Sequence, residues 1–381
     1  MTIMAFRVQS RSNTRAICVQ GQIEVARCVQ NLVEVKCTRR TGLVQKNIIN
    51  YMIYKEKTFA VAPMMDWTDR HCRVFHRVLS RAAVLYTEMV TAQAVIHGNR
   101  EKLIGFDAVE HPVVLQLGGS DPKLLAEACR IGEGFGYDAI NLNVGCPSDR
   151  VQGGNFGACL MATPQLVADC FAAMQAAVKI PVTIKCRIGI DDQDEETALD
   201  EFVRAVSGAG CNTFIVHARK AWLQGLSPKE NREIPPLNYD RVHRLKAANP
   251  QLHIELNGGL QTVEQGLPHL ADLDGLMFGR FAYHQPWELT KVDPAFTGAA
   301  APVASRREAV EAMLPYISRY VATGAPLHHI TRHMLGLYHA QAGGRFWRQI
   351  LTMDGQKHGA GVEVLHRAIE VVEEQAAKLA A

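Results

Sequence analysis

The chain has 381 residues, of which 48% are hydrophobic and 21% charged, a composition typical of a soluble globular protein. Its net charge of +3 is too small to indicate a nucleic-acid binder by itself, and its length suits one large domain with a smaller one. Ten cysteines without a CxxC pair, and no apolar run of roughly 18 residues, exclude a disulfide scaffold and a membrane protein, so we expect a cytoplasmic protein.

Residues 1–51 differ in composition from the rest of the chain. They carry eight Lys or Arg and two Glu, a net charge of +6, which leaves −3 for the remainder. Such a segment is typical of a basic nucleic-acid arm or an organelle transit peptide. The alternative is a non-native or disordered extension, because Met52 directly precedes the first domain-like residues. We favour this second interpretation.

From residue 58 onward, short β-rich runs alternate with helix-like stretches. The eight β-rich runs cover residues 59–63, 84–89, 112–119, 139–146, 182–189, 213–219, 253–259 and 275–280. The helix-like stretches include residues 121–135, 163–178, 195–208, 240–249 and 263–270. Strands that alternate with helices pair in parallel, so residues 52–297 are predicted to form a (β/α)8 TIM barrel. A doubly wound Rossmann sheet is the alternative, but no GxGxxG follows a strand.

Residues 298–381 follow a different pattern. After a linker near residue 300, helical stretches are predicted over residues 305–321, 326–340, 344–353 and 361–379. Breaks at Gly324-Ala325-Pro326 and Gly343-Gly344 separate them, because glycine and proline end helices. We therefore expect a small helical domain after the barrel.

Polar side chains occupy the C-terminal ends of the predicted strands, where barrels of this kind place their active sites. They are Glu88, Gln116, Asn143, Cys146, Lys185, Arg187, His217, Arg219 and Asn257. These residues alternate with apolar ones, so we expect them to face away from the helices. A single residue of this kind is more often a hydrogen-bonded core group, but its repetition at most strand ends predicts a site.

Residues 139–161 concentrate the unusual chemistry, since Asn141 and Asn143 share one strand face and Cys146 follows them. A glycine-rich loop comes next. Because a free thiol is mostly protonated at neutral pH, Cys146 is a candidate proton donor. Nucleophilic attack is the alternative and needs a base as partner. For Cys159 we expect a packing role.

Glycines follow the last two predicted strands, in Asn257-Gly258-Gly259 and in Gly279-Arg280. Barrels often bind a phosphate here, because backbone N–H groups can approach an anion closely, and Arg280 adds charge-assisted hydrogen bonds. The alternative is a pair of tight turns that need glycine. With Lys185 and His217 across the mouth, the pattern suggests a planar, phosphorylated redox cofactor such as a flavin.

Four long motifs carry a resemblance to a known family: APMMDWTDRHCR at 62–73, LNVGCPSDRVQ at 142–152, HARKAWLQGLSPKENREIPPL at 217–237 and RHMLGLY at 332–338. They are similar to motifs of the tRNA-dihydrouridine synthases, most closely the A subfamily, over about residues 59–352. The family reduces the C5–C6 double bond of uridines in the tRNA D-loop with FMN and NADPH, at positions 20 and 20a in this subfamily. The resemblance implies that activity here.

The resemblance also implies roles for individual residues. The FMN contacts that it implies are Pro63, Met64, Met65, Gln116, Lys185, His217, Asn257, Gly258, Gly259, Gly279 and Arg280, of which the last five hold the phosphate. Cys146 would give a proton to C5 of the uridine after hydride from reduced FMN reaches C6. The tRNA contacts would be Asn143 near the flipped base, together with Lys229, Arg232, Arg345 and Arg348. We expect a monomer without a bound metal.

Two other functions stay open at this stage. One is an FMN-dependent TIM-barrel reductase of a small free pyrimidine or enone, which would not need a basic helical region after the barrel. The other is an RNA-binding or chaperone-like protein with a degenerate, colourless barrel. A zinc site at His329 and His333 is not expected, because the zincin pattern needs a Glu after the first His and Ile330 follows here.

Overall fold

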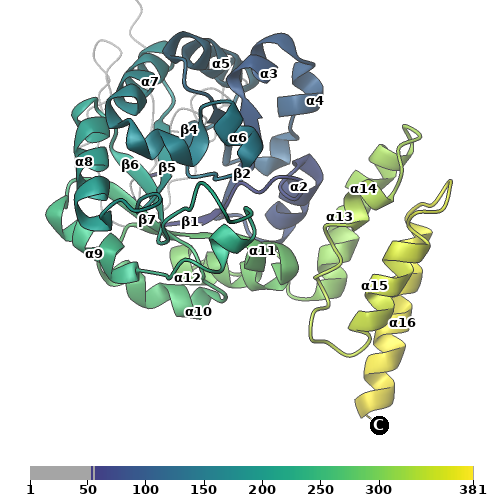
Figure 1. Cartoon of the computed structure of the whole chain (residues 1–381). Helices are drawn as coiled ribbons and strands as arrows, with labels where there is room; N and C mark the ends of the chain where they lie inside the picture. The colour runs from purple at the N-terminus through teal and green to yellow at the C-terminus, as the bar shows by residue number, and fades with distance from the viewer. Residues whose placement is uncertain (1–52, 55, 381) are drawn as a thin grey trace, which may run out of the picture. The chain divides into compact units, whose positions relative to one another are not determined.

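The computed structural model describes residues 53–54 and 56–380, so the interpretation of residues 1–51 lies outside the described residues. Eight parallel strands close into a barrel in chain order, which confirms the predicted (β/α)8 fold (Figure 1). The strands are β1 (Thr58–Val61), β2 (Val84–Thr91), β3 (Val113–Gly118), β4 (Ala139–Val144), β5 (Val182–Arg187), β6 (Thr213–His217), β7 (His253–Asn257) and β8 (Gly275–Phe278).

Helices follow the strands along the chain and surround the barrel, as α5, α7, α8 and α9 show in Figure 1. They are α2 (Arg70–Leu79), α3 (Ala92–His97), α4 (Arg100–Ile104), α5 (Pro122–Phe135), α6 (Asp149–Gly153), α7 (Pro164–Ala177), α8 (Glu195–Gly208), α9 (Tyr239–Ala248), α10 (Val263–Gly266), α11 (Arg280–His284) and α12 (Val292–Thr297). Aspartates are the N-cap residues of three of these helices. The side chains of Asp69, Asp121 and Asp194 each accept hydrogen bonds from two backbone N–H groups of the first turn.

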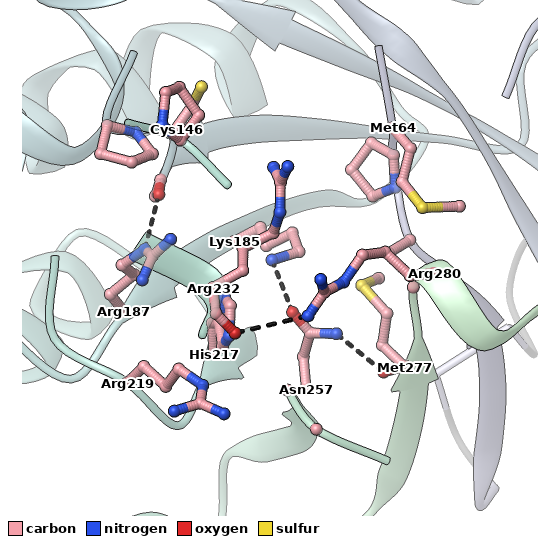
Figure 2. A pocket seen from close by; sticks show the side chains of 18 of the residues that line it. Met64, Cys146, Lys185, Arg187, His217, Arg219, Arg232, Asn257, Met277 and Arg280 are labelled. Atoms are coloured by element: carbon pink, nitrogen blue, oxygen red, sulfur yellow. Dashed lines mark hydrogen bonds between the residues drawn. The ribbon is translucent and has the colours of Figure 1, made fainter. Parts of the chain in front are cut away.

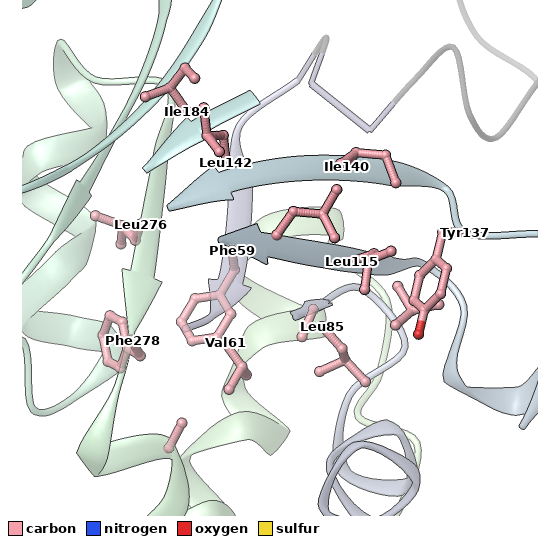
Figure 3. Close-up of a cluster of buried hydrophobic side chains, with 14 of the residues drawn as sticks. Phe59, Val61, Leu85, Leu115, Tyr137, Ile140, Leu142, Ile184, Leu276 and Phe278 are labelled. Atoms are coloured by element: carbon pink, nitrogen blue, oxygen red, sulfur yellow. The ribbon is translucent and has the colours of Figure 1, made fainter. Parts of the chain in front are cut away.

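Side chains alternate between the two faces of each strand, and this alternation separates the core from the site. The outward residues pack against the helices in one large buried cluster (Figure 3). It includes Phe59, Val61, Leu115, Ile140 and Leu142. A smaller apolar cluster inside the barrel includes Ala60, Tyr86, Val114, Ile215 and Met277. The outward face thus supplies most of the apolar burial, which leaves inward positions free for polar groups.

One strand departs from this alternation. The register between β2 and β3 shifts between Tyr86 and Met89. At the shift, the Thr87 hydroxyl accepts a hydrogen bond from the backbone N–H of Gln116 at 3.0 Å. Met89 rather than Glu88 therefore faces the barrel mouth, and the carboxylate of Glu88 accepts a hydrogen bond from the backbone N–H of Asp66. The expectation that Glu88 faces the interior is wrong for this reason.

The residues after the barrel are helical, with α13 (Arg306–Val321), α14 (His328–Thr331), α15 (Gly344–Met353) and α16 (Glu363–Ala380). The helix predicted over residues 326–340 is wrong beyond α14. Residues 332–340 form successive turns, in which Leu337 N–H donates to the carbonyl of Met334 at 3.0 Å. Long-range packing explains the difference, because a Cβ at Gly336 would lie 2.3 Å from the carbonyl oxygen of His284.

Asp69 joins α2 to these later residues. Its Oδ1 caps α2, while its Oδ2 accepts a hydrogen bond from Arg332 at 2.6 Å and lies 3.0 Å from Nε2 of His333. Burial alone would raise the pKa of Asp69, but its bonds to His333 and Arg332 hold that pKa well below its usual range. The motifs at 62–73 and 332–338 therefore meet in space.

No helix in the described part of the chain has the length and apolar character needed to cross a membrane.

Candidate active site

A cavity of about 730 Å³ opens at the C-terminal ends of the strands (Figure 2). All eleven residues predicted to bind the cofactor line it, from Pro63, Met64 and Met65 after β1 to Gly279 and Arg280 after β8. Cys146 and two of the predicted tRNA contacts, Asn143 and Arg232, line the same cavity. The fold therefore brings together residues from seven strand ends that are far apart in the sequence.

The cavity is strongly cationic. Five basic side chains line it, namely Lys185, Arg187, Arg219, Arg232 and Arg280. Glu233 is the single acidic residue in the lining. Arg280 forms an ion pair with Glu233, so four cations have no carboxylate partner among the lining residues. Such a surface favours an anionic ligand, because a cleft with low-dielectric walls focuses the field of its charges.

Lys185 extends from β5 towards the centre of the cavity (Figure 2). Its Nζ donates to Oδ1 of Asn257 at 2.9 Å, and the Asn257 amide donates in turn to the Met277 carbonyl at 2.8 Å. Burial and the nearby Arg187 lower the pKa of Lys185 to about 8. The ammonium group is thus charged at neutral pH and close to its titration range.

His217 ends β6 beside the glycine turn that follows β7. Burial, with Arg187 and Lys185 nearby, holds the pKa of His217 well below its usual range, so its imidazole is neutral. A Cβ at Gly258 would lie 2.5 Å from Cδ2 of this ring, and the backbone there has φ +112°. Gly258 is therefore required by both space and conformation.

The loop that carries Cys146 is held by side chains from two strands. Oδ1 of Asn143 accepts the backbone N–H groups of Gly145 at 3.1 Å and of Cys146 at 3.0 Å. Nε of Arg187 donates to the Gly145 carbonyl at 2.8 Å. The Cys146 thiol stays half-buried and faces the cavity, with its Sγ 3.5 Å from Oγ of Ser148. These contacts fix the position of the Cys146 thiol at the cavity.

Asn231 is a structural residue that the sequence did not single out. Its side chain accepts from Trp222 N–H and donates to the Trp222 and Leu226 carbonyls, which closes the loop after β6. Its own carbonyl accepts from Arg187 at 3.0 Å, so Arg187 joins the Cys146 loop to this loop. The motif at 217–237 marked the segment, but only the fold reveals that Asn231 is fully buried.

Three predicted tRNA contacts lie outside the cavity lining. Lys229 is exposed in the loop after β6. Arg345 and Arg348 are exposed on α15, a helix whose sequence GRFWRQILTM contains no acidic residue. The exposed Phe346 lies between them in the sequence. Helix α15 therefore exposes two arginines and carries no acidic side chain of its own.

The residues present fit a planar cofactor that carries a phosphate. The carboxamides of Gln116 and Asn257 and the ammonium of Lys185 can hydrogen-bond a polar ring edge, while Pro63, Met64 and Met277 supply apolar contacts. At Gly279 an added Cβ would meet only Ala62 and Met64, each at 3.9 Å, so the backbone is open to the cavity. In the described part of the chain, no group of three His, Cys, Asp or Glu side chains is arranged to hold a metal ion.

Comparison with known proteins identifies a family and close relatives of the chain. The model of the family described as "Dihydrouridine synthase (Dus)" matches residues 60–375. A protein of Xanthomonas campestris pv. campestris named tRNA-dihydrouridine(20/20a) synthase is 56% identical over 322 residues, which cover 84% of this chain and 96% of the relative. Proteins of the same name from Shewanella oneidensis and Escherichia coli O6:H1 are each 54% identical, over 86% and 85% of this chain and 98% of each relative.

Proposed function

Because the chain belongs to the dihydrouridine synthase family, we propose that it reduces uridines 20 and 20a of tRNA to 5,6-dihydrouridine, with FMN bound in the barrel cavity. Enzymes of this family are flavin-dependent oxidoreductases that act on a CH–CH bond with NADPH as donor. The observation that carries the proposal is that Cys146 and Lys185 face one cationic cavity at the barrel mouth. We infer a cytoplasmic monomer that acts on the D-loop.

The reaction consumes NADPH, one proton and a uridine, and yields NADP⁺ and dihydrouridine. The bound FMN would supply the hydride chemistry, since a flavin can accept hydride from NADPH and donate it to C6 of the uridine. The chain supplies the proton. We assign the Cys146 thiol as its donor and C5 of the uridine as its acceptor. The thiolate that remains regains a proton from solvent, since Cys146 is half-buried at the cavity mouth. Arg187 stabilises the loop meanwhile through the Gly145 carbonyl.

Cofactor binding divides among side chains of different chemistry. Lys185, which lines the cavity, would supply a positive charge to stabilise the negative charge of a reduced flavin. Gln116 and the neutral His217 would hydrogen-bond polar groups of the cofactor. The turns Asn257-Gly258-Gly259 and Gly279-Arg280, which line the cavity, would hold the phosphate through their backbone N–H groups and the Arg280 side chain.

The tRNA substrate requires a second set of contacts. A uridine in a folded tRNA must leave its stack to reach the cavity, where Asn143 lies beside Cys146. Lys229, Arg232, Arg345 and Arg348 would contact phosphates, which set the register of the RNA without reading its sequence. The cationic, acid-free α15 supports this assignment.

The direct test is nucleoside mass spectrometry with position mapping. Unmodified tRNA is incubated with the purified protein, FMN and NADPH, and we expect a gain of 2 Da at uridines 20 and 20a. A gain elsewhere in the D-loop would keep the reaction and refute the positions. Reduction of free uridine or of a small enone, with tRNA left unmodified, would support the small-molecule reductase instead.

We expect the double variant Arg345→Ala, Arg348→Ala to bind tRNA about tenfold more weakly or worse and to retain its flavin. Each arginine removed from a phosphate contact lowers the salt dependence of binding. The negative slope of log K against log [salt] should therefore become shallower by about 2 for the double variant. The matched control is Arg307→Gln, Arg367→Gln, which removes the same charge from arginines paired with Glu373 and Asp354. Equal affinities for the two double variants would refute the role of α15.

A further inference from the structure

Polar side chains from β3, β4 and β5 form one continuous hydrogen-bond series inside the barrel. The series begins at Asn143, whose Oδ1 accepts the backbone N–H of Cys146 at 3.0 Å and whose Nδ2 donates to Oε1 of Gln116 at 2.9 Å. Nε2 of Gln116 then donates to Oδ1 of Asn141 at 2.8 Å. Nδ2 of Asn141 donates to the Thr183 hydroxyl at 2.9 Å, and that hydroxyl reaches the Ile140 carbonyl at 3.3 Å.

Every step of this series runs in the same direction. Each carboxamide accepts on the side of Cys146 and donates on the side of Thr183, so reversing one of them would set like groups against each other at two contacts. All four side chains are buried, with Asn141 and Thr183 at 0% exposure. Water therefore cannot replace a lost partner easily, and the orientation of each group depends on the next one.

Asn141 lies behind the site and not in it. Gln116 and Asn143 line the cavity, whereas Asn141 does not. Asn141 precedes Asn143 by two residues on β4, so it lies deeper in the barrel than Asn143. In the register of the sheet it lies opposite Gln116 of β3 and Thr183 of β5. Its carboxamide is therefore the central contact of the series and joins three neighbouring strands. An apolar residue of similar size would fill the space but break two bonds.

We propose that Asn141 is a positioning residue for proton delivery, and this inference rests on the proposed function. Asn141 fixes the orientation of Gln116, Gln116 fixes that of Asn143, and Asn143 holds the backbone of Gly145 and Cys146. This series of hydrogen bonds thereby holds the Cys146 thiol in one position at the cavity. Loss of Asn141 removes one of the two bonds that orient Gln116 and lets the Cys146 loop move, but it leaves Lys185, His217 and the glycine turns after β7 and β8 unchanged.

The test compares Asn141→Leu with wild type in the flavin-loaded enzyme. We expect flavin content and the rate of flavin reduction by NADPH to stay within about twofold, while transfer from pre-reduced enzyme to tRNA slows about tenfold. A second readout needs no tRNA: alkylation of Cys146 by iodoacetamide, followed on the tryptic peptide 131–150, which holds no other cysteine. We expect that alkylation to become about threefold faster.

Asn141→Asp is the conservative variant. Burial raises the pKa of an aspartic acid at this depth, and the neutral acid can accept from Gln116 and donate to Thr183 as Asn141 does. We therefore expect Asn141→Asp to stay within about threefold of wild type in both readouts. An Asn141→Asp enzyme as slow as Asn141→Leu would overturn the proposal, because the pattern of donors and acceptors would then be irrelevant.

Thr183→Val keeps the test valid if Asn141→Leu does not fold. It preserves volume, removes the acceptor of Asn141 and should slow transfer to tRNA about threefold. The matched control is Thr331→Val, since the buried hydroxyl of Thr331 has no hydrogen-bond partner among the described residues. Wild-type transfer and alkylation rates in Thr183→Val would overturn the proposal. If wild type forms no dihydrouridine, the proposed function fails, and the alkylation rates still decide the role of Asn141.

Discussion

Replacing Cys146 with alanine is expected to lower the rate of dihydrouridine formation about a thousandfold, because a positioned general acid contributes roughly 10²–10⁴ to such a step. The variant should still bind FMN and accept electrons from NADPH, since none of the cationic or carboxamide groups around the cavity is changed. The reductive half-reaction, followed by loss of the oxidised-flavin absorbance, and dihydrouridine formation, followed by mass spectrometry, separate the two effects.

Cys159→Ala is the matched control for this variant. Cys159 is also half-buried, but its thiol donates to the Phe156 carbonyl and is not part of the cavity lining. We expect this variant to turn over at the wild-type rate. Full turnover by Cys146→Ala would remove the thiol from the reaction, and equal losses in both variants would point to general damage to the fold.

Replacing Lys185 with methionine is expected to weaken FMN binding by at least about tenfold at pH 7, because a hydrogen bond from a charged group contributes roughly 1.5–3 kcal/mol. The charge also predicts a pH dependence. With a pKa of about 8 in the cofactor-free protein, Lys185 is cationic below pH 8 and neutral above it. The affinity of the apoprotein for FMN should therefore fall as the pH rises from 7 to 9, as measured by quenching of flavin fluorescence.

Lys185→Met should bind FMN weakly and almost independently of pH over the same range. The matched control is Lys220→Met, since Nζ of Lys220 donates to the Gln193 carbonyl and is not part of the cavity lining. Lys220→Met should keep both the affinity and the pH dependence of wild type. A pH dependence that survives in Lys185→Met would assign the titration to another group.

The barrel could be predicted from the sequence because its strands follow two simple rules. Apolar residues such as Ile140 and Leu142 alternate with polar ones such as Asn141 and Asn143, and strand ends of a parallel barrel share one mouth. These rules were sufficient to predict that Cys146, Lys185 and the glycines after β7 and β8 lie at one mouth of the barrel, where they line one cavity.

The features that escaped prediction depend on contacts between distant segments. Residues 332–340 have a helical pattern, yet the close approach of Gly336 to His284 and the bonds of His333 to Asp69 hold them in turns. The alternation pointed to Gln116, Asn141 and Asn143, but the hydrogen bonds that join them could not be predicted, and neither could those of Asn231, because bonds across strands and loops leave no period in the sequence. Sequence patterns thus locate the site, and the fold shows which buried amides hold it in place.

The register shift in β2 has an electrostatic consequence. Uninterrupted alternation from Val84 and Tyr86 would aim the carboxylate of Glu88 at the barrel mouth, beside the five cations of the cavity. There it would neutralise the field that attracts an anionic ligand, and it would repel a phosphate or a reduced flavin. The irregularity presents the thioether of Met89 instead and directs the acid to the backbone of Asp66. The register shift in β2 thereby keeps the negative charge of Glu88 out of the cavity.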